Sequence, residues 1–329
     1  LQKHLHGKGY TAEIYKKSKY LDDSIAESTG IWAGRHFETD DAIIFVGACG
    51  IAVRSIAPYV ASKKSDPAVL VIDECGKFVI SLLSGHLGGA NELTLEVAEL
   101  LGAVPVVTTA TDLHHRFAVD VFAKKNCCGI QNMKAAKEVS AALLAGEPVG
   151  FYSEFPWTGK LPEGLEESSE DTQDKPEIGI AVTIHPTCKP FTSTVQIIPR
   201  VVTLGMGCRR NKEADVIEKE ASVCLADADI YSQAVEKLTS ISIKKDEVGL
   251  QKLAEDWRIP FITFEEEELS HAEGEFTPSE FVKKITGVNN VCERSAVLGA
   301  EQGRLIKNKT GRNGVTTALA LRYWEVQFE

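Results

Sequence analysis

Eight residues between an expected strand and an expected helix carry the densest set of reactive groups, Ser84-Gly85-His86-Leu87-Gly88-Gly89-Ala90-Asn91. Three glycines in five positions let backbone N–H groups approach a ligand closely. The helix that follows adds a partial positive charge, which suits a carboxylate or a developing oxyanion. His86 titrates near neutral pH and could move protons, and we expect it and Asn91 to be catalytic. The residues that we expect to bind substrate here are Ser84, Gly85, Gly88 and Gly89.

The same segment also has a purely structural interpretation. It could be a glycine-rich turn in which Asn91 only caps the helix and His86 faces solvent. Spacing alone does not decide between the two. Nucleotide binding is a poor explanation, because the segment lacks the GxxxxGK[ST] pattern of a phosphate-binding loop.

Carboxylates and hydroxyls follow two neighbouring expected strands. Glu74, preceded by Asp73, ends a strand just before a glycine and is a candidate general base, although acids in turns are usually only solvated. Thr109 and Asp112 end the strand 104–112 and are candidate substrate contacts. Their alternative role is to cap the next helix.

Gly50 and Arg54 follow another expected strand, at a strand–helix junction. The guanidinium could bind a substrate carboxylate through two hydrogen bonds, although a single arginine is more often a surface residue. In doubly wound sheets, ligands bind beyond the carboxyl ends of the strands. We therefore expect one cleft, formed by the loop with His86 and by the ends of the strands 41–50, 68–74 and 104–112.

A second glycine turn occurs at Gly205-Met206-Gly207-Cys208-Arg209-Arg210. Arg210 stands where the dinucleotide fingerprint GxGxxG requires glycine, so an anion cradle is the better interpretation. Further along, Lys244 and Glu247 begin a helix and could also be ordinary surface charges. Glu293 and Arg294 are neighbours in a helix, so only one of them can easily face the interior. The expected substrate contacts in this part are Gly205, Gly207, Arg209, Lys244, Glu247 and Glu293.

The elements that must position these groups predict two α/β domains with mainly parallel sheets, joined by a small middle module. Their expected bounds are 1–127, 128–200 and 201–329. The chain opens with residues typical of the end of a helix, LQKHLHGKGY, so we expect a first strand and helix to be missing. An exposed acidic loop is expected at 155–177. Helices are expected in the last domain near 231–240, 246–257, 277–286 and 290–302.

Bulk composition excludes several partners. The net charge is −11, from 36 basic and 47 acidic residues, which argues against nucleic acid. No apolar run approaches the ~18 residues of a membrane span. None of the eight cysteines forms a CxxC pair, so free thiols in the cytoplasm are favoured over disulfides or a zinc site. We therefore expect a cytoplasmic protein with no nucleic-acid, membrane or metal partner.

Longer segments resemble the CbiG family. GACGIAVRSIAP, DPAVLVIDECGKFVISLLSGHLGGANELT and LGAVPVVTTATD are similar, in order and spacing, to the N-terminal domain of CbiG proteins. LGMGCRR, SIKKDEVGL, TPSEFV, TGVNNVCERSA and GVTTALA are similar to their C-terminal domain, which also occurs alone as CobE. The resemblance runs from about 41 to 320 and is weakest across 128–200. Cys49 and Cys75 depart from it, because other small residues are expected there.

The resemblance implies a hydrolase of the anaerobic cobalamin (vitamin B12) pathway that acts on cobalt-precorrin-5A. Water would open the δ-lactone of this tetrapyrrole, and C–C cleavage would release acetaldehyde and leave cobalt-precorrin-5B. The macrocycle could accept the electrons, so we expect no cofactor beyond the cobalt of the substrate. Its carboxylate arms would contact basic groups such as Arg54, Arg209, Arg210 and Lys244. A homodimer and contacts with other enzymes of corrin synthesis are possible.

Two other functions remain open at this point. A non-catalytic carrier of corrinoid intermediates would bind the pigment without changing it. An enzyme dependent on NAD or S-adenosylmethionine ranks third, because the glycine pattern of the second turn is incomplete. Release of acetaldehyde separates the hydrolase from both.

Overall fold

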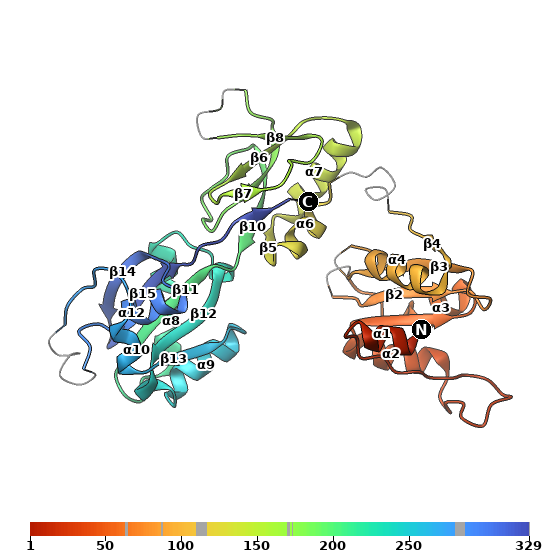
Figure 1. The fold of residues 1–329 in the computed structure, drawn as a ribbon, viewed down its shortest axis with the longest axis horizontal. Helices are drawn as coiled ribbons and strands as arrows, with labels where there is room; N and C mark the ends of the chain where they lie inside the picture. The colour runs from red at the N-terminus through yellow and green to blue at the C-terminus, as the bar shows by residue number, and fades with distance from the viewer. Residues whose placement is uncertain are drawn as a thin grey trace. The chain divides into compact units, whose positions relative to one another are not determined.

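The computed structural model describes residues 1–62, 65–86, 88–109, 117–169, 172, 174–279 and 287–328. It divides into two compact units, Leu1–Val121 and Phe122–Glu329, which are described separately (Figure 1).

The first unit contains a four-stranded sheet in the order β1-β2-β3-β4. Strands β1 and β2 are parallel, β2 and β3 are antiparallel across a tight turn, and β3 and β4 are parallel. Every residue of β2 is buried, as its continuous apolar sequence AVLVI predicts. The strands are β1 (Ala42–Val46), β2 (Ala68–Ile72), β3 (Phe78–Leu83) and β4 (Val104–Val106).

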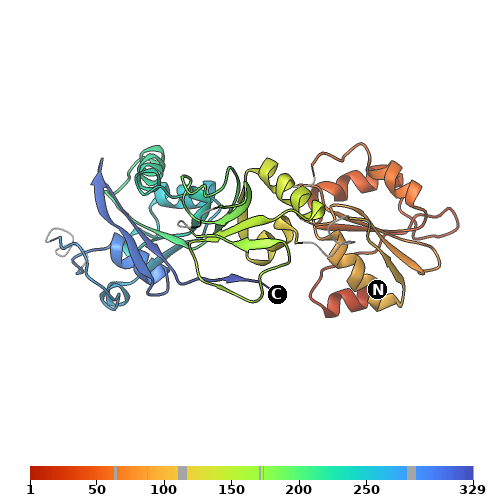
Figure 2. The ribbon, with the colours of Figure 1, turned by 90° about the horizontal axis from the view of Figure 1, so that it is seen from above.

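Helices cover both faces of this sheet (Figure 2). On one face, α1 (Gln2–Gly7) and α4 (Ala90–Leu101) pack against β2 and β3. On the other, α2 (Thr29–Thr39) and α3 (Cys49–Ile56) pack against β1 and β2. α4 buries one face at helical spacing and ends at Gly102, whose left-handed backbone closes the helix.

The second unit begins with a five-stranded sheet in the order β5-β10-β9-β6-β8. The helix α7 (Met133–Ala145) packs on it. Its strands are β5 (Cys128–Gln131), β6 (Val149–Ser153), β8 (Leu165–Glu167), β9 (Ile178–Val182) and β10 (Ser193–Pro199). The expected loop 155–177 therefore contains a strand, β8, and a second short one, β7 (Trp157–Thr158), which pairs with β16 (Val326–Gln327).

A second five-stranded sheet in this unit has the order β13-β12-β11-β15-β14. Strands β11, β12 and β13 are parallel, and the final hairpin of β14 and β15 adds antiparallel neighbours. The mixed α/β class with mainly parallel sheets is thus confirmed. The strands are β11 (Val202–Cys208), β12 (Val235–Ile241), β13 (Phe261–Phe264), β14 (Arg304–Arg312) and β15 (Val315–Leu321). The helices are α8 (Ala214–Asp227), α9 (Val248–Asp256), α10 (Glu266–Ser270) and α12 (Cys292–Gly299).

One expected helix is wrong. Residues 231–240 form a single 3₁₀ turn, Ser232–Ala234, followed by β12. The segment Val-Glu-Lys-Leu favours a helix locally, but β12 lies between β11 and β13 and buries its last four residues completely. Tertiary burial therefore overrides local preference. Of the expected helix 277–286, residues 280–286 lie outside the described part of the chain.

Gly205 in β11 lets α12 lie directly on the strand. A Cβ atom built there would sit 1.9 Å from the carbonyl oxygen of Cys292 and 2.9 Å from the Cβ of Ala296. No side chain can occupy that space without moving backbone. The glycine is therefore required by helix–sheet packing.

We predict that Gly205→Ala lowers the free energy of unfolding by about 1–3 kcal/mol, because α12 must shift away from β11. Gly30→Ala is the matched control, since a Cβ atom at Gly30 meets nothing within 4 Å. The urea midpoint of each variant measures the effect. Equal midpoints for the two variants would contradict close packing at Gly205.

Candidate functional site

The turn between β2 and β3 divides the candidate residues of the first unit between two edges of its sheet. Gly50, Arg54 and Glu74 follow the ends of β1 and β2, at the β1/β2 exit edge. The loop 84–89 and Thr109 follow the ends of β3 and β4, at the opposite, β3/β4 exit edge. The six residues of β3 separate the edges by roughly 20 Å, at ~3.3 Å per residue. The expectation of one cleft for all three strand ends is therefore wrong.

The carboxylates at the β1/β2 exit edge do not reach His86. Glu74 is exposed in the turn. Asp73 accepts hydrogen bonds from the backbone N–H groups of Phe78 (2.6 Å) and Cys75 (3.0 Å). These bonds lower the pKa of Asp73, and the bond from Phe78 has the largest effect. Asp73 therefore stabilises the turn, and the structure does not support Glu74 as a catalytic partner of His86.

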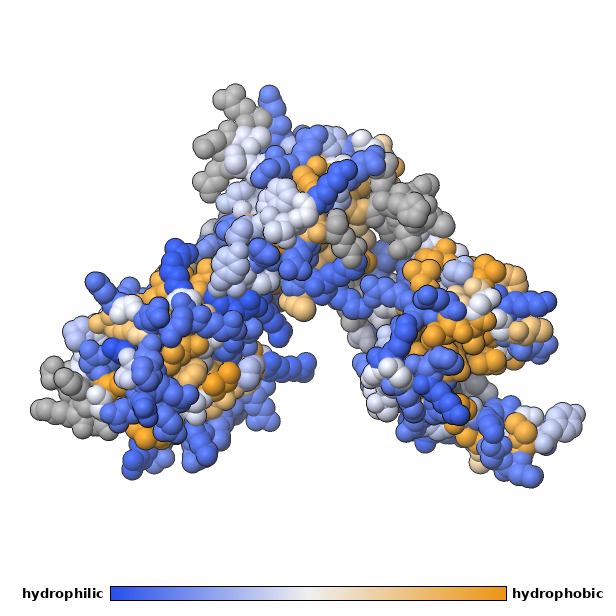
Figure 3. Space-filling view, viewed as in Figure 1, coloured by the Kyte–Doolittle hydropathy of each residue, from blue (hydrophilic) through white to orange (hydrophobic). Residues whose placement is uncertain are grey.

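The two edges also differ in the polarity and burial of their side chains. Val46, Phe78 and Val104 are 69%, 45% and 55% exposed at the β1/β2 exit edge, and hydrophobic areas are visible on the surface of this unit (Figure 3). The β3/β4 exit edge instead buries the polar side chains of Ser84 and Asn91. Buried polar groups need partners, so the second edge is the better candidate for a site.

Asn91 connects three elements at the β3/β4 exit edge. Its amide oxygen accepts a hydrogen bond from the hydroxyl of Ser81 in β3 (2.6 Å), and its Nδ2 donates to Oγ1 of Thr109 (3.0 Å). Asn91 lies inside α4, and the cap position is Gly89, with φ +82°. The interpretation of Asn91 as a simple N-cap is therefore wrong. Asp112, the other candidate beyond β4, lies outside the described residues.

The loop glycines are required by the packing of the loop itself. A Cβ atom at Gly85 would lie 2.7 Å from the amide oxygen of Asn91, and one at Gly88 would lie 2.4 Å from the Cβ of Ser84. Ser84 has a left-handed backbone, with φ +59°. Its hydroxyl is buried and has no hydrogen-bond partner within the part of the chain that the structure describes.

Three backbone N–H groups at the end of the loop and the start of α4 are already occupied. Gly89 donates to the carbonyl of His86, Ala90 to that of Ser84 and Asn91 to that of Gly85, at 3.0, 3.1 and 3.0 Å. These N–H groups are not the donors that an oxyanion would meet in this conformation. The donors expected in this segment for a carboxylate or an oxyanion are thus reduced to the remaining amides and the side chains.

His86 faces a carboxylate that the sequence did not reveal. Its Nδ1 lies 3.3 Å from Oδ1 of Asp120, and each side chain is 15% exposed. Both residues belong to the first unit, and Asp120 lies in the first turn of α6 (Val119–Lys125). The contact joins residues 34 positions apart, so no spacing rule could have found it.

In the second unit, the glycine turn is shaped by packing. A Cβ atom at Gly207 would lie 2.8 Å from Oγ1 of Thr316, much as Gly205 accommodates α12. The backbone N–H of Arg209 donates to the carbonyl of Gly314 (2.9 Å), while its side chain is exposed. The structure therefore explains both glycines without a ligand and leaves the guanidinium of Arg209 at the surface.

Lys244 and Glu247 support this turn. Their side chains form an ion pair of 2.9 Å and are 15% and 8% exposed. Oε1 of Glu247 accepts the backbone N–H of Lys212 (3.3 Å). Desolvation alone would raise the pKa of Glu247, but Lys244 and these backbone donors hold it below its usual range. Burial also raises the pKa of the nearby Cys208 thiol to about 11. Lys244 and Glu247 therefore have a structural role in this turn, and their contact with substrate stays a prediction.

Glu293 is completely buried at the start of α12. Its carboxylate accepts hydrogen bonds from the N–H and Oγ1 of Thr277, Nδ2 of Asn290 and the N–H of Lys309, at 2.6–2.8 Å. With four donors it has no capacity left for substrate, so the expected substrate contact is wrong. Arg294 faces the other side, over the ring of Phe276 at 4.5 Å, as the alternation along the helix predicts.

The described residues contain neither a membrane-spanning helix nor a cluster of metal-binding side chains. No helix among them is long and apolar enough to cross a membrane. No group of three or more His, Cys, Asp or Glu side chains among them is arranged to hold a metal ion.

Comparison with known proteins matches three successive parts of the chain to family models. Residues 32–112 match "Cobalamin synthesis G N-terminal", residues 117–199 match "Cobalamin biosynthesis central region" and residues 202–320 match "Cobalamin synthesis G C-terminus". The chain is 37% identical over 302 residues to the cobalt-precorrin-5A hydrolase of Salmonella typhimurium, covering 88% of this chain and 85% of that protein. It is 35% identical over 298 residues to the enzyme of that name from Priestia megaterium, covering 86% and 79%.

Solved structures include related proteins. A cobalamin biosynthesis protein G homolog from Sulfolobus solfataricus is 24% identical, with 87% of this chain and 83% of that chain covered and a TM-score of 0.36. CobE is 29% identical, with 38% and 92% covered and a TM-score of 0.36.

We predict that Glu293→Gln lowers the free energy of unfolding by roughly 1.5–3 kcal/mol, because an amide cannot accept all four hydrogen bonds. Chemical denaturation measures the loss, and Glu218→Gln, an exposed position on α8, is the control. Unchanged stability together with weaker pigment binding would instead return Glu293 to the substrate site.

Proposed function

Because this chain belongs to the CbiG family of cobalamin-synthesis proteins, we propose that it is a cobalt-precorrin-5A hydrolase. The observation that carries this conclusion is the 37% identity to a hydrolase of that name across 85% of its length. The resemblance inferred from the sequence motifs is thereby confirmed at the level of the family.

The reaction has two steps with different demands. Water adds to the lactone carbonyl and the acyl–oxygen bond breaks, which gives a carboxylate and an alcohol. The alcohol then loses its proton and its C–C bond to the ring breaks, so that the former meso carbon leaves with its methyl group as acetaldehyde. The conjugated macrocycle with its cobalt takes up the electron pair of that bond. We therefore propose that no further cofactor takes part.

Both steps need a base, and we propose His86. It is the one histidine of the segment 84–91, and imidazole is the side chain best suited to proton transfer near neutral pH. It lies at the β3/β4 exit edge and directly follows Gly85, which packs against the buried amide of Asn91. The hydroxyl of Ser84 in the same loop is buried and has no hydrogen-bond partner among the described residues, and we propose it as a donor to a substrate oxygen. This combination of a proton acceptor and fixed donors suits opening of a lactone.

Exposed arginines are proposed contacts for the carboxylate arms of the substrate. Arg209 presents its guanidinium at the surface of the second unit, and Arg54 lies over Gly50 in the first. A polyanionic substrate needs such local cations, because the chain as a whole carries −11 charges. We also place the enzyme in the cytoplasm, where its eight free thiols would stay reduced.

The protein should release one acetaldehyde for each cobalt-precorrin-5A consumed. A coupled alcohol dehydrogenase assay measures the aldehyde, and mass spectrometry of the pigment measures the loss of two carbons. Binding of the pigment without any aldehyde would contradict the hydrolase and leave a carrier of corrinoid intermediates.

His86→Gln should reduce kcat by about 10²–10⁴-fold while pigment affinity and melting temperature stay unchanged, because only the proton acceptor is lost. Turnover and thermal unfolding are measured on the same sample. A folded variant with near-normal kcat would exclude His86 as the base.

A further inference from the structure

A cavity in the second unit lies outside the groups assigned so far. Its volume is about 370 Å³, which falls in the ~300–1,000 Å³ range of small-molecule sites. Among the described residues that line it, Lys189 carries the only formal charge. The other lining residues are neutral, and all but Phe191 are polar. The cavity therefore combines the size of a ligand site with a single positive charge.

Two buried residues of β10 hold the loop 185–191, which carries Lys189. Nε2 of Gln196 lies 2.9–3.3 Å from three carbonyl oxygens of this loop. Oγ1 of Thr194 accepts the backbone N–H of Phe191 (3.1 Å) and donates to its carbonyl oxygen (2.8 Å). Gln196 and Thr194 are 3% and 5% exposed, so water competes little for these bonds. The backbone that presents Lys189 is therefore organised before any ligand arrives.

Tyr231 completes this wall of the cavity. Its hydroxyl donates to Oε1 of Gln196 (2.8 Å). Burial and, after it, the negative charge of Asp229 raise the pKa of Tyr231, so the phenol stays neutral. Asp229 itself accepts a hydrogen bond from Thr187 and is not among the residues that line the cavity. The wall therefore adds no negative charge that would repel an anion.

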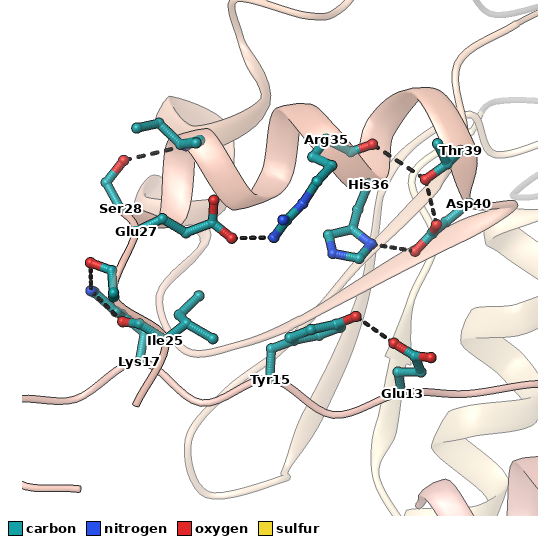
Figure 4. Close-up of polar contacts among 12 residues, drawn as sticks. Glu13, Tyr15, Lys17, Ile25, Glu27, Ser28, Arg35, His36, Thr39 and Asp40 are labelled. Atoms are coloured by element: carbon teal, nitrogen blue, oxygen red, sulfur yellow. Dashed lines mark hydrogen bonds and ion pairs between the residues drawn. The ribbon is translucent and has the colours of Figure 1, made fainter. Parts of the chain in front are cut away.

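Lys189 is exposed, and its ammonium forms no hydrogen bond or ion pair with any residue that the structure describes. Basic residues of the first unit show the more usual arrangement (Figure 4). Nζ of Lys17 donates to the carbonyl oxygen of Ile25 (2.8 Å), and Arg35 forms an ion pair with Glu27. Those cations have partners within the chain, whereas the charge of Lys189 remains for a ligand.

We propose that this cavity binds the carboxylate group of a small organic molecule, with Lys189 as the cation that recognises it. One ammonium balances the charge of one carboxylate, while a second cation in the cavity would be repelled. The hydroxyl of Thr192, which is exposed and lines the cavity, is a second donor. The inference goes beyond the hydrolase function, because it concerns a site in the other unit from the loop 84–91.

Binding of propionate to the full chain tests the proposal, with the neutral propionamide as the control ligand. Equilibrium dialysis should show one saturable site for propionate and far weaker binding of propionamide. Lys189→Gln should weaken propionate binding by about 10–100-fold, because a charge-assisted hydrogen bond is lost. Lys219→Gln removes an exposed charge on α8 and should leave the affinity unchanged.

A second variant tests the cavity and not the charge. Thr192→Phe adds a ring at an exposed lining position, so it should weaken propionate binding while the melting temperature stays unchanged. Equal binding of propionate and propionamide, or undiminished binding of propionate by Lys189→Gln, would overturn the proposal.

Competition with cobalt-precorrin-5A distinguishes two sources of the carboxylate. If the pigment displaces propionate and binds more weakly to Lys189→Gln, the cavity holds a carboxylate arm of the substrate. If propionate stays bound in the presence of the pigment, the ligand is a separate small carboxylate. Each readout is binding without turnover, so a protein that binds propionate but releases no acetaldehyde refutes the hydrolase function alone.

Discussion

The buried amide of Asn91 is the constraint on which the first unit depends at its β3/β4 exit edge. An amide that is 6% exposed must satisfy its oxygen and its nitrogen inside the protein, and here it does so with Ser81 and Thr109. Those two bonds connect the end of β3, the first turn of α4 and the chain beyond β4. They also require glycine at position 85, since any side chain there would collide with the amide. His86 directly follows Gly85 in this loop.

Several side chains that are candidate substrate contacts in the sequence form hydrogen bonds or ion pairs that hold loops in place. Glu293 gathers four donors at the start of α12, and Glu247 with Lys244 fixes the chain that leaves β11. Buried carboxylates are stable only when their oxygens are paired, which explains why these groups are saturated. A catalytic group must instead keep an atom available for substrate. Among the residues proposed for chemistry, Arg209 has its backbone N–H fixed by the carbonyl of Gly314 while its side chain stays exposed.

The sequence revealed the fold class and the glycine loop because both depend on local patterns. Continuous apolar runs identified β1 and β2, and the glycines with His86 identified the loop. The turn at Gly76 reverses the chain between β2 and β3, which places Glu74 and His86 at opposite edges of the sheet. Two features could not be predicted from the sequence. Strand β12 has a helix-forming sequence that burial overrides, and the contact of Asp120 with His86 depends on tertiary structure alone.

We propose that the lactone meets water at the β3/β4 exit edge. A structure of the His86→Gln protein with cobalt-precorrin-5A bound tests this most directly, because the slowed variant should retain the uncleaved substrate. The lactone carbonyl carbon should lie within ~4 Å of the side chain at position 86, directly or through one water molecule. A lactone bound beside Glu74 and Arg54 at the β1/β2 exit edge, or held entirely by the second unit, would contradict the account.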